Sequence, residues 1–215
     1  MVYFIRWSVF SVGLIFFSMG IVLAINVQYL GIQSWDVLHV ALNNKFGLTI
    51  GSWSIIVGTL LILITLVIDY KFIRTGTFIN IICVGMLVDL FLWLDFLPKA
   101  THTWTDLFII MGGMVLMGLA GGMYNAGGVG SGPRDGFMLA ISQKWNYSIK
   151  RIRMTMETFV LIFGFLLGGP LFIFTFIFTF VQSPLFEFSY IRIGEFIAKF
   201  QVKHEGRLEE ERKQA

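Results

Sequence analysis

The residues of this chain best suited to chemistry lie in a glycine-rich stretch, residues 127–136, which reads GGVGSGPRDG. It separates two long apolar runs and carries five glycines, one proline and the adjacent pair Arg134 and Asp135. Glycines at this density indicate irregular backbone that lets neighbouring segments approach closely. A carboxylate beside such a break could hold a cation or a proton, or pair with a cationic substrate. The alternative is a tight cytoplasmic turn whose arginine anchors at the lipid headgroups.

The first half of the chain carries a counterpart of this stretch. An offset of 99 positions aligns polar residues and glycines of the two halves, and an offset of 98 extends the match. Apolar matches are common between membrane segments, whereas matches of Asn, Asp and Lys at a fixed offset are not. We therefore predict an internal duplication with a unit of about a hundred residues. The aligned pairs are Asn26 and Asn125, Gly31 and Gly130, Asp36 and Asp135, Lys45 and Lys144, then Thr77 and Thr175, and Asp89 and Glu187.

The composition places the chain among polytopic membrane proteins. Hydrophobic residues make up 56% of its 215 residues, charged residues make up only 13%, and the mean hydropathy is +0.79. These values are too apolar for a soluble domain. The basic residues lie beside apolar runs, so a pI near 9.1 does not indicate nucleic acid as a partner. The single cysteine, Cys83, excludes a disulfide within the chain.

Hydropathy predicts an all-α protein with about six membrane-spanning helices. Two further segments, residues 34–45 and 133–145, are too short to cross, and they either dip into the membrane or lie at its interface. Ser34 is the candidate N-cap of the first segment. We expect an interfacial amphipathic helix over residues 190–200 and a mobile, charged tail over residues 201–215. The predicted spans cover residues 7–27, 52–68, 77–97, 106–125, 154–167 and 171–188.

The basic residues are distributed unequally between the two sides of the predicted membrane. If the N-terminus is cytoplasmic, fourteen of the 16 lysines and arginines lie in cytoplasmic segments, and only Lys45 and Lys99 lie outside. This asymmetry follows the positive-inside rule and predicts that both termini are cytoplasmic. Membrane repeat 1, residues 1–99, and membrane repeat 2, residues 100–200, then hold three spans each. An odd number of spans gives the two repeats opposite orientations in the membrane.

Two interrupted segments at matching places in inverted halves are typical of the central site of a transporter. The glycines expected to allow close packing are Gly130, Gly132 and Gly136 in the loop, and Gly118 and Gly122 in the span before it. The candidate substrate- or ion-binding residues are Asp36, Asp135, Asn26, Asn125, Arg134, Asp89 and Glu187.

Each of these polar residues also has a purely structural interpretation. Asp36 and Asp135 could cap the short helices in which they lie, because a carboxylate accepts from the free N–H groups of a first turn. Arg134 could pair with its neighbour or with a headgroup, and the two asparagines could tie helix ends together. Asp89 and Glu187 would be interfacial if their spans end early.

The remaining polar residues argue against an enzyme or a metalloprotein. Glu157 follows Arg153 by four positions, which favours an ion pair on one helix face. His39 and His102 are isolated histidines expected near water, with no second ligand at a metal-binding spacing. The sequence contains no nucleophile–base set, phosphate-binding loop or CxxC motif. We expect no catalytic activity, no metal and no cofactor.

Three motifs resemble those of the bacterial YczE/YyaS/YitT-type integral membrane proteins, most closely the YczE branch. They are GSGPRDGFMLAI in residues 130–141, GIQSWDVLHVAL in residues 31–42, and METFVLIFGFLLGGP in residues 156–170. The run LFIFTFIFTF, residues 171–180, departs from the Gly- and Thr-rich run of that family. The resemblance implies an integral protein of the bacterial cytoplasmic membrane, and it implies no particular substrate.

The sequence thus predicts six spans in two inverted three-helix repeats with two broken or re-entrant segments. The leading hypothesis is transport of a small solute or ion through a site at the repeat interface. The alternative is a non-transporting membrane factor that stabilises or regulates a partner complex. The expected partners are the lipid bilayer and a small solute or ion, with a protein partner or a second copy of the chain also open.

Overall fold

The computed structural model describes residues 2–214, and all of their side chains except those of residues 149, 150, 179 and 203–215. Over this range the chain is entirely helical, with eight α-helices and two short 3-10 helices. The elements are α1 (Val2–Asn26), η1 (Gln28–Leu30), α2 (Ser34–Phe46), α3 (Ile50–Asp69), η2 (Tyr70–Phe72), α4 (Thr75–Leu94), α5 (Thr105–Ala126), α6 (Pro133–Trp145), α7 (Ile149–Leu166) and α8 (Ile173–Gln214).

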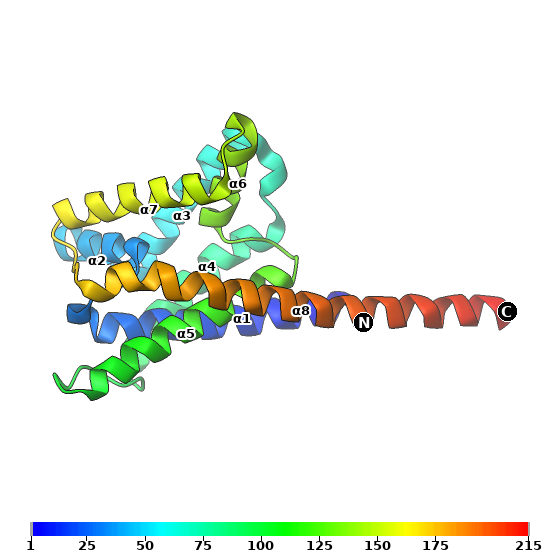
Figure 1. The fold of residues 1–215 in the computed structure, drawn as a ribbon, viewed down its shortest axis with the longest axis horizontal. Coiled ribbons are helices and arrows are strands. Elements are labelled where there is room, and N and C mark those ends of the chain that lie inside the picture. The colour runs from blue at the N-terminus through cyan, green and yellow to red at the C-terminus, as the bar shows by residue number, and fades with distance from the viewer. Residues whose placement is uncertain (1, 215) are drawn as a thin grey trace.

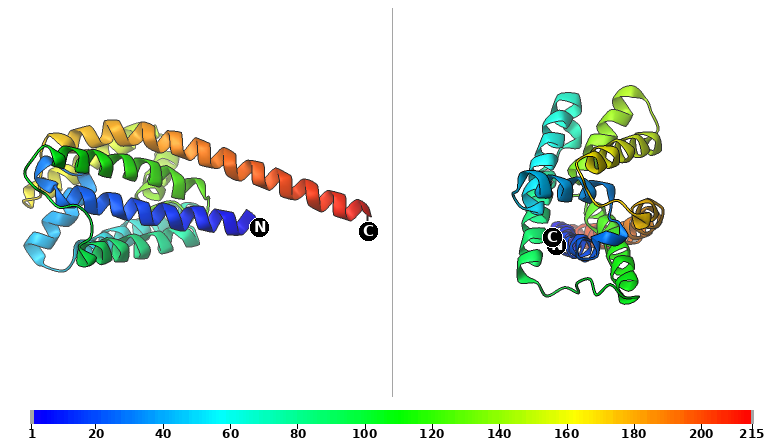
Figure 2. Two further views of the ribbon diagram at one scale, coloured as in Figure 1. Left: turned by 90° about the horizontal axis from the view of Figure 1, so that it is seen from below. Right: turned by 90° about the vertical axis from the view of Figure 1, so that its left-hand side faces the viewer.

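Three long helices, α1, α5 and α8, lie side by side along the length of the bundle (Figures 1 and 2). α7 packs against α2, while α3 packs against both α4 and α6. The last part of α8 continues well beyond the other helices (Figure 1). The long helices therefore form one body, and only α8 extends out of it.

The connections between helices gather at two ends of this bundle. At the end where α1 begins, here called the terminal end, Arg6 Nη2 donates to Gln201 Oε1 of α8 at 3.1 Å. At the opposite or distal end, Asn26 Nδ2 donates to the carbonyl oxygen of Pro98 at 3.0 Å. Most of the described helices run from one end toward the other: α1, α3, α4, α5, α7 and α8 (Figure 1). The exceptions are the short helices α2 and α6.

Helix boundaries in the second half follow those of the first at the offsets seen in the sequence. α2 and α6 begin at residues 34 and 133 and end at residues 46 and 145. α3 and α7 begin at residues 50 and 149, and α4 and α8 begin at residues 75 and 173. The packing is also reciprocal, because α2 contacts α7 while α6 contacts α3.

The chain segments before α2 and α6 make matching close contacts. A Cβ on Gly31, whose φ is +103°, would lie 2.7 Å from the backbone nitrogen of Thr175 at the start of α8. A Cβ on Gly130 would lie 2.5 Å from the backbone nitrogen of Thr77 at the start of α4. Both threonines are buried. The segment before each short helix therefore packs on the start of the last helix of the other half, and only glycine fits at the contact.

α5 and α8 also approach closely through glycine. A Cβ on Gly118 would lie 2.8 Å from Leu185 Cβ, and a Cβ on Gly122 would lie 2.3 Å from the carbonyl oxygen of Phe186. Small residues four positions apart let two helix backbones come together, which is how helices associate in lipid. The two glycines therefore lie at the interface between α5 and α8.

Two local expectations are wrong. The predicted end of a span at residue 188 and the separate helix over 190–200 are replaced by one continuous helix, α8, over Ile173–Gln214, which also takes in most of the predicted tail. Pro184 lies inside this helix and does not end it; membrane helices tolerate such prolines. Ser34 is the first residue of α2 rather than its cap, and no side chain caps that helix.

Four helical segments are long and apolar enough to cross a membrane: α1, α3 with η2 (Ile50–Phe72), α4 and α5. Their outer faces expose large apolar side chains; Val67, for example, is 86% exposed and Phe108 is 76% exposed. Such surface requires a lipid environment. α7 and α8 carry more polar residues.

The contact between α5 and α8 can be tested with a pair of glycine substitutions on one helix. We expect Gly122→Ala to lower the free energy of unfolding by about 1–3 kcal/mol, because the added methyl group overpacks the helix contact. Gly112→Ala is the matched control, since a Cβ there meets nothing within 4 Å. The measurement is thermal unfolding in detergent. Equal melting temperatures for the two variants would contradict the packing.

Candidate functional site

The first turns of the two short helices, α2 and α6, face each other inside the bundle. The Arg134 guanidinium carbon lies 4.8 Å from the centre of the Trp35 ring, and Arg134 Nη2 lies 4.0 Å from Asp36 Oδ1. No side chain caps the N-terminus of either helix, and α6 begins with Pro133. The positive ends of both helix dipoles therefore point toward a shared space.

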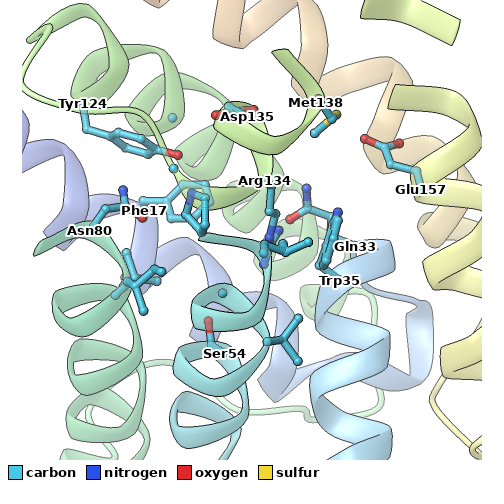
Figure 3. Close-up of a pocket in the computed structure, with 18 of the residues that line it drawn as sticks. Phe17, Gln33, Trp35, Ser54, Asn80, Tyr124, Arg134, Asp135, Met138 and Glu157 are labelled. Atoms are coloured by element: carbon cyan, nitrogen blue, oxygen red, sulfur yellow. The ribbon is translucent and has the colours of Figure 1, made fainter. Parts of the chain in front are cut away.

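A cavity of about 90 Å³ lies between these two turns. Side chains from α2, α3, α4, α5, α6 and α7 point into it (Figure 3). The lining combines polar and charged groups with an apolar wall, which is the composition expected of a small-molecule site. Its polar lining residues are Gln33, Trp35, His39, Ser54, Asn80, Tyr124, Arg134, Asp135, Arg153, Glu157, Gln182 and Ser183.

Arg134 is the central cation of this cavity. Its side chain is mostly buried, and the nearest carboxylate oxygen, on Asp36, is beyond hydrogen-bond distance at 4.0 Å. Within the described part of the chain, no group accepts a hydrogen bond from the guanidinium. Since an arginine presents five N–H donors in a fixed fork, this side chain retains donors that a ligand could use.

The second half of the polar lining is an ion-pair network. Arg153 Nη2 donates to Asp135 Oδ1 at 3.3 Å, and Arg153 Nε lies 3.9 Å from Glu157 Oε1. Asn125 Nδ2 donates to Asp135 Oδ2 at 3.4 Å and to the carbonyl oxygen of Gly121 at 2.9 Å. The pair of Glu157 and Arg153 expected from their spacing therefore forms, and Asp135 extends it toward α5.

Several buried polar atoms near the cavity lack a partner. Asn80 is 4% exposed and its Nδ2 makes no hydrogen bond to the described residues. Gln33 Nε2 donates to Gln182 Oε1 at 3.0 Å, but Gln33 Oε1 is unpaired, as is Asp36 Oδ2. Buried polar groups are nearly always satisfied, so unpaired groups at a cavity indicate that a ligand or water completes them.

A larger hollow of about 520 Å³, here called the vestibule, adjoins the cavity toward the terminal end. Lys71, Arg74 and Ser131 lie on its wall. It shares Asp135 and Arg153 with the central cavity. The ion pair between these two residues therefore lies at the boundary between the vestibule and the cavity.

A cluster of hydrogen bonds lies at the distal end. Tyr29 Oη donates to Asp106 Oδ2 at 2.5 Å, and the backbone nitrogens of Thr101 and His102 donate to the same carboxylate at 2.9 and 2.8 Å. The hydrogen bond to Asp106 raises the pKa of the Tyr29 hydroxyl above its usual value. This cluster ties η1 to the loop before α5.

The structure brings some of the predicted site residues together. Arg134 and Asp135 line the central cavity, and Asn125 lines the vestibule. Asp36 is buried beside Arg134 and His39, at 4.0 and 3.8 Å. The loop glycines lie close by, since a Cβ on Gly132 would lie 3.2 Å from Tyr124 Oη. A Cβ on Gly136 would lie 3.3 Å from the carbonyl oxygen of Phe72.

Other predicted site residues lie away from the cavity. Asn26 bonds to the Pro98 carbonyl at the distal end. Asp89 accepts from Thr49 Oγ1 at 2.5 Å and from the backbone nitrogen of Gly51 at 2.8 Å, so it secures the start of α3. Glu187 is exposed on α8. These three residues do not line either hollow.

The sequence interpretation missed several lining residues and misplaced one. His39 was expected near water but is buried, 3% exposed, beside Asp36. Asn80, Tyr124 and Gln33 were not predicted as site residues. Only Asn80 carried a signal, because an amide in the middle of an apolar span needs a partner there.

Comparison with known proteins follows the motifs already described. The model of the Family of unknown function (DUF6198) matches residues 4–200. The chain belongs to this family. It is similar to the uncharacterised membrane protein YczE of Bacillus subtilis (strain 168), with 35% identity over 78% of this chain and 77% of YczE. It is also similar to the uncharacterised protein YyaS of the same organism, with 26% identity over 77% of this chain and 83% of YyaS.

These relatives confirm the resemblance to the YczE and YyaS proteins. An uncharacterised protein of Haemophilus influenzae (strain ATCC 51907 / DSM 11121 / KW20 / Rd) shares 29% identity over 65% of this chain and 63% of its own length. No solved structure matches the chain. Membership of this family and the four apolar helices identify an integral membrane protein.

The different surroundings of Asp89 and its sequence counterpart Glu187 can be tested by removing the charge of each. We expect Asp89→Asn to lower the free energy of unfolding by about 1 kcal/mol, because the carboxylate satisfies the start of α3. Glu187→Gln is the matched change and should leave stability unchanged, since its side chain is exposed. Thermal unfolding in detergent measures both. A larger loss of stability in Glu187→Gln than in Asp89→Asn would contradict the hydrogen-bonded position of Asp89 and the exposed position of Glu187.

Proposed function

We propose that this protein transports a small solute or ion by alternating access, with its binding site in the cavity between the first turns of α2 and α6. The observation that carries the proposal is the meeting of two uncapped half-helix N-termini at one polar cavity inside an apolar bundle. Secondary transporters place their substrate sites at such discontinuous helices near the middle of the membrane.

The proposal includes two inverted repeats, residues 1–99 and 100–200. The equal helix offsets support it, and so do the reciprocal contacts of Gly31 with Thr175 and of Gly130 with Thr77. An exchange of conformations between two such halves would open the cavity alternately to either end. The vestibule then represents access from the terminal end, and the Tyr29–Asp106 cluster represents closure of the distal end.

In this proposal α7 and α8 cross the membrane as the fifth and sixth spans. Their polar residues do not oppose this assignment, because Arg153, Glu157 and Gln182 line the cavity instead of facing lipid. Ionisable residues within membrane segments almost always face the bundle interior and pair there. The terminal end carries most of the basic residues, and the positive-inside rule therefore supports our proposal that this end faces the cytoplasm at a bacterial inner membrane.

Single-cysteine labelling tests the inverted topology. In a Cys83→Ser background, we expect Asn44→Cys at the end of α2 and Gln143→Cys at the end of α6 to react from opposite sides of the membrane. The two positions are sequence counterparts at an offset of 99, and both are exposed. A membrane-impermeant maleimide on sealed right-side-out and inverted vesicles measures the side. Labelling of both from one side would contradict the inverted repeats.

Solute uptake tests transport itself. Proteoliposomes containing the full chain would be assayed with radiolabelled acetate, lactate, ethanolamine and glycerol. We expect uptake of one of these classes, and Asp135→Asn should slow it about tenfold because the ion pair with Arg153 is lost. Asp95→Asn is the matched control, since it breaks the exposed ion pair with Lys99 outside the cavity. No uptake above empty liposomes would oppose transport.

A second candidate function is that of a membrane factor that binds a partner protein. The extension of α8 beyond the bundle favours it, because the end of this helix projects past the other helices (Figure 2). This role needs no solute site. It is favoured if no solute is taken up and the charge-removing variants of the cavity leave the protein equally stable.

A further inference from the structure

We propose that the solute is a small monocarboxylate, bound with its carboxylate at Arg134 between the first turns of α2 and α6. This inference rests on the proposed transport function and identifies the substrate class for the same cavity. It differs from the expectation that the carboxylates of the chain recognise a cation.

The first step is the balance of hydrogen-bond donors and acceptors in the cavity. The nearest carboxylate oxygen lies 4.0 Å from Arg134, beyond hydrogen-bond distance, and Asn80 Nδ2 is buried without an acceptor among the described residues. The unpaired acceptors beside them are Gln33 Oε1 and Asp36 Oδ2. Asn80 and Arg134 come from different helices, α4 and α6, and both line the cavity (Figure 3). Unused donors on two sides of one small space fit a ligand that is an acceptor, and a carboxylate accepts two hydrogen bonds from an arginine fork.

The second step is the direction of the two helix dipoles. Gln33 and Trp35 at the start of α2, and Gly132 and Pro133 at the start of α6, all line the cavity. No side chain caps either helix. Each N-terminus carries a partial positive charge that favours an anion. A cation at the same place would be repelled by the two helix N-termini and by the Arg134 guanidinium.

The third step is the state of the acidic side chains. Asp135 is hydrogen-bonded to Arg153 and Asn125, and Glu157 lies 3.9 Å from Arg153. These two carboxylates already face cations or donors and are poor ligands for a further cation. The third, Asp36, has an unpaired Oδ2 but lies 4.0 Å from the Arg134 guanidinium, which opposes a second cation there. Their negative charge also makes a dianion costly, so the anion is expected to carry a single charge.

The fourth step is size and access. A cavity of about 90 Å³ holds about six to nine water-sized atoms, which matches a small carboxylic acid with six or more non-hydrogen atoms, such as lactate. The vestibule that leads to it carries Lys71, Arg74 and Arg153 against the single acid Asp135. This excess of positive charge raises the local concentration of anions at the entrance.

The experiment is a binding titration of the purified full chain in nanodiscs, followed by tryptophan fluorescence because Trp35 lies beneath Arg134. The probes are lactate, its neutral analogue lactamide, the cation ethanolammonium, and inorganic phosphate. We expect saturable binding of lactate and a Kd at least tenfold weaker for the other three. Equal or tighter binding of lactamide, ethanolammonium or phosphate would overturn the carboxylate assignment and leave transport open.

Two variants and one control locate the site. Arg134→Gln should weaken lactate binding about a hundredfold, because two charge-assisted hydrogen bonds are lost. Asn80→Leu keeps every charge and should weaken it about tenfold, which covers the case in which the arginine variant fails to fold. Arg151→Gln, an exposed arginine outside the cavity, should bind as the wild type does. Unchanged lactate affinity in Asn80→Leu and Arg134→Gln would overturn the site.

The failure of this inference can be told apart from failure of the proposed function. Uptake and binding that favour ethanolamine or glycerol, with loss in Asp135→Asn, would retain a transporter and reject the carboxylate. The absence of both uptake and binding for every probe would reject the two together. Lactate binding that is abolished in Arg134→Gln, without uptake, would retain the carboxylate site and reject transport.

Discussion

The architecture depends on one constraint: a helix that stops inside an apolar bundle leaves backbone groups that lipid cannot satisfy. The segments before α2 and α6 meet this constraint by packing directly on the first turns of α8 and α4 at Gly31 and Gly130. The buried hydroxyls of Thr175 and Thr77 accept from the backbone nitrogens of Phe172 and Arg74, both at 3.4 Å. Broken backbone is thus enclosed by protein, and polar groups become possible at the centre.

Enclosure of the two breaks has an electrostatic consequence. The first turns of α2 and α6 bring positive dipole ends together, and Arg134 adds a full charge to the same space. Asp36 and Asp135 occupy the third position of each helix and offset part of this charge, without capping either helix. The proposed transport function uses what remains, which is a set of donors around a cavity that adjoins the vestibule.

The sequence predicted the equal offsets of the helix starts well, because Gly, Asn and Asp at a fixed offset indicate similar backbone geometry at the two places. It could not separate Asp36 and Asp135 from Asp89, since equal spacing says nothing about which acid faces the interior and which satisfies a helix start. Tyr124 and Gln33 become site residues only through packing. The continuity of α8 was missed because the apolar run ends near residue 188 and charged residues follow, whereas the helix itself continues past this change and packs against α5.

The contact between Arg134 and Trp35 has a further meaning, because these residues are counterparts at an offset of 99 and touch each other. A residue that meets its own counterpart lies next to a pseudosymmetry axis. In an ancestral dimer of identical halves, arginine there would have faced arginine, and tryptophan would have faced tryptophan. Neither an arginine–arginine pair nor a tryptophan–tryptophan pair can form the contact between a guanidinium and an aromatic ring that is present here. If the chain arose by the proposed duplication, fusion of two copies into one chain would remove that restriction and make an asymmetric, singly charged centre possible.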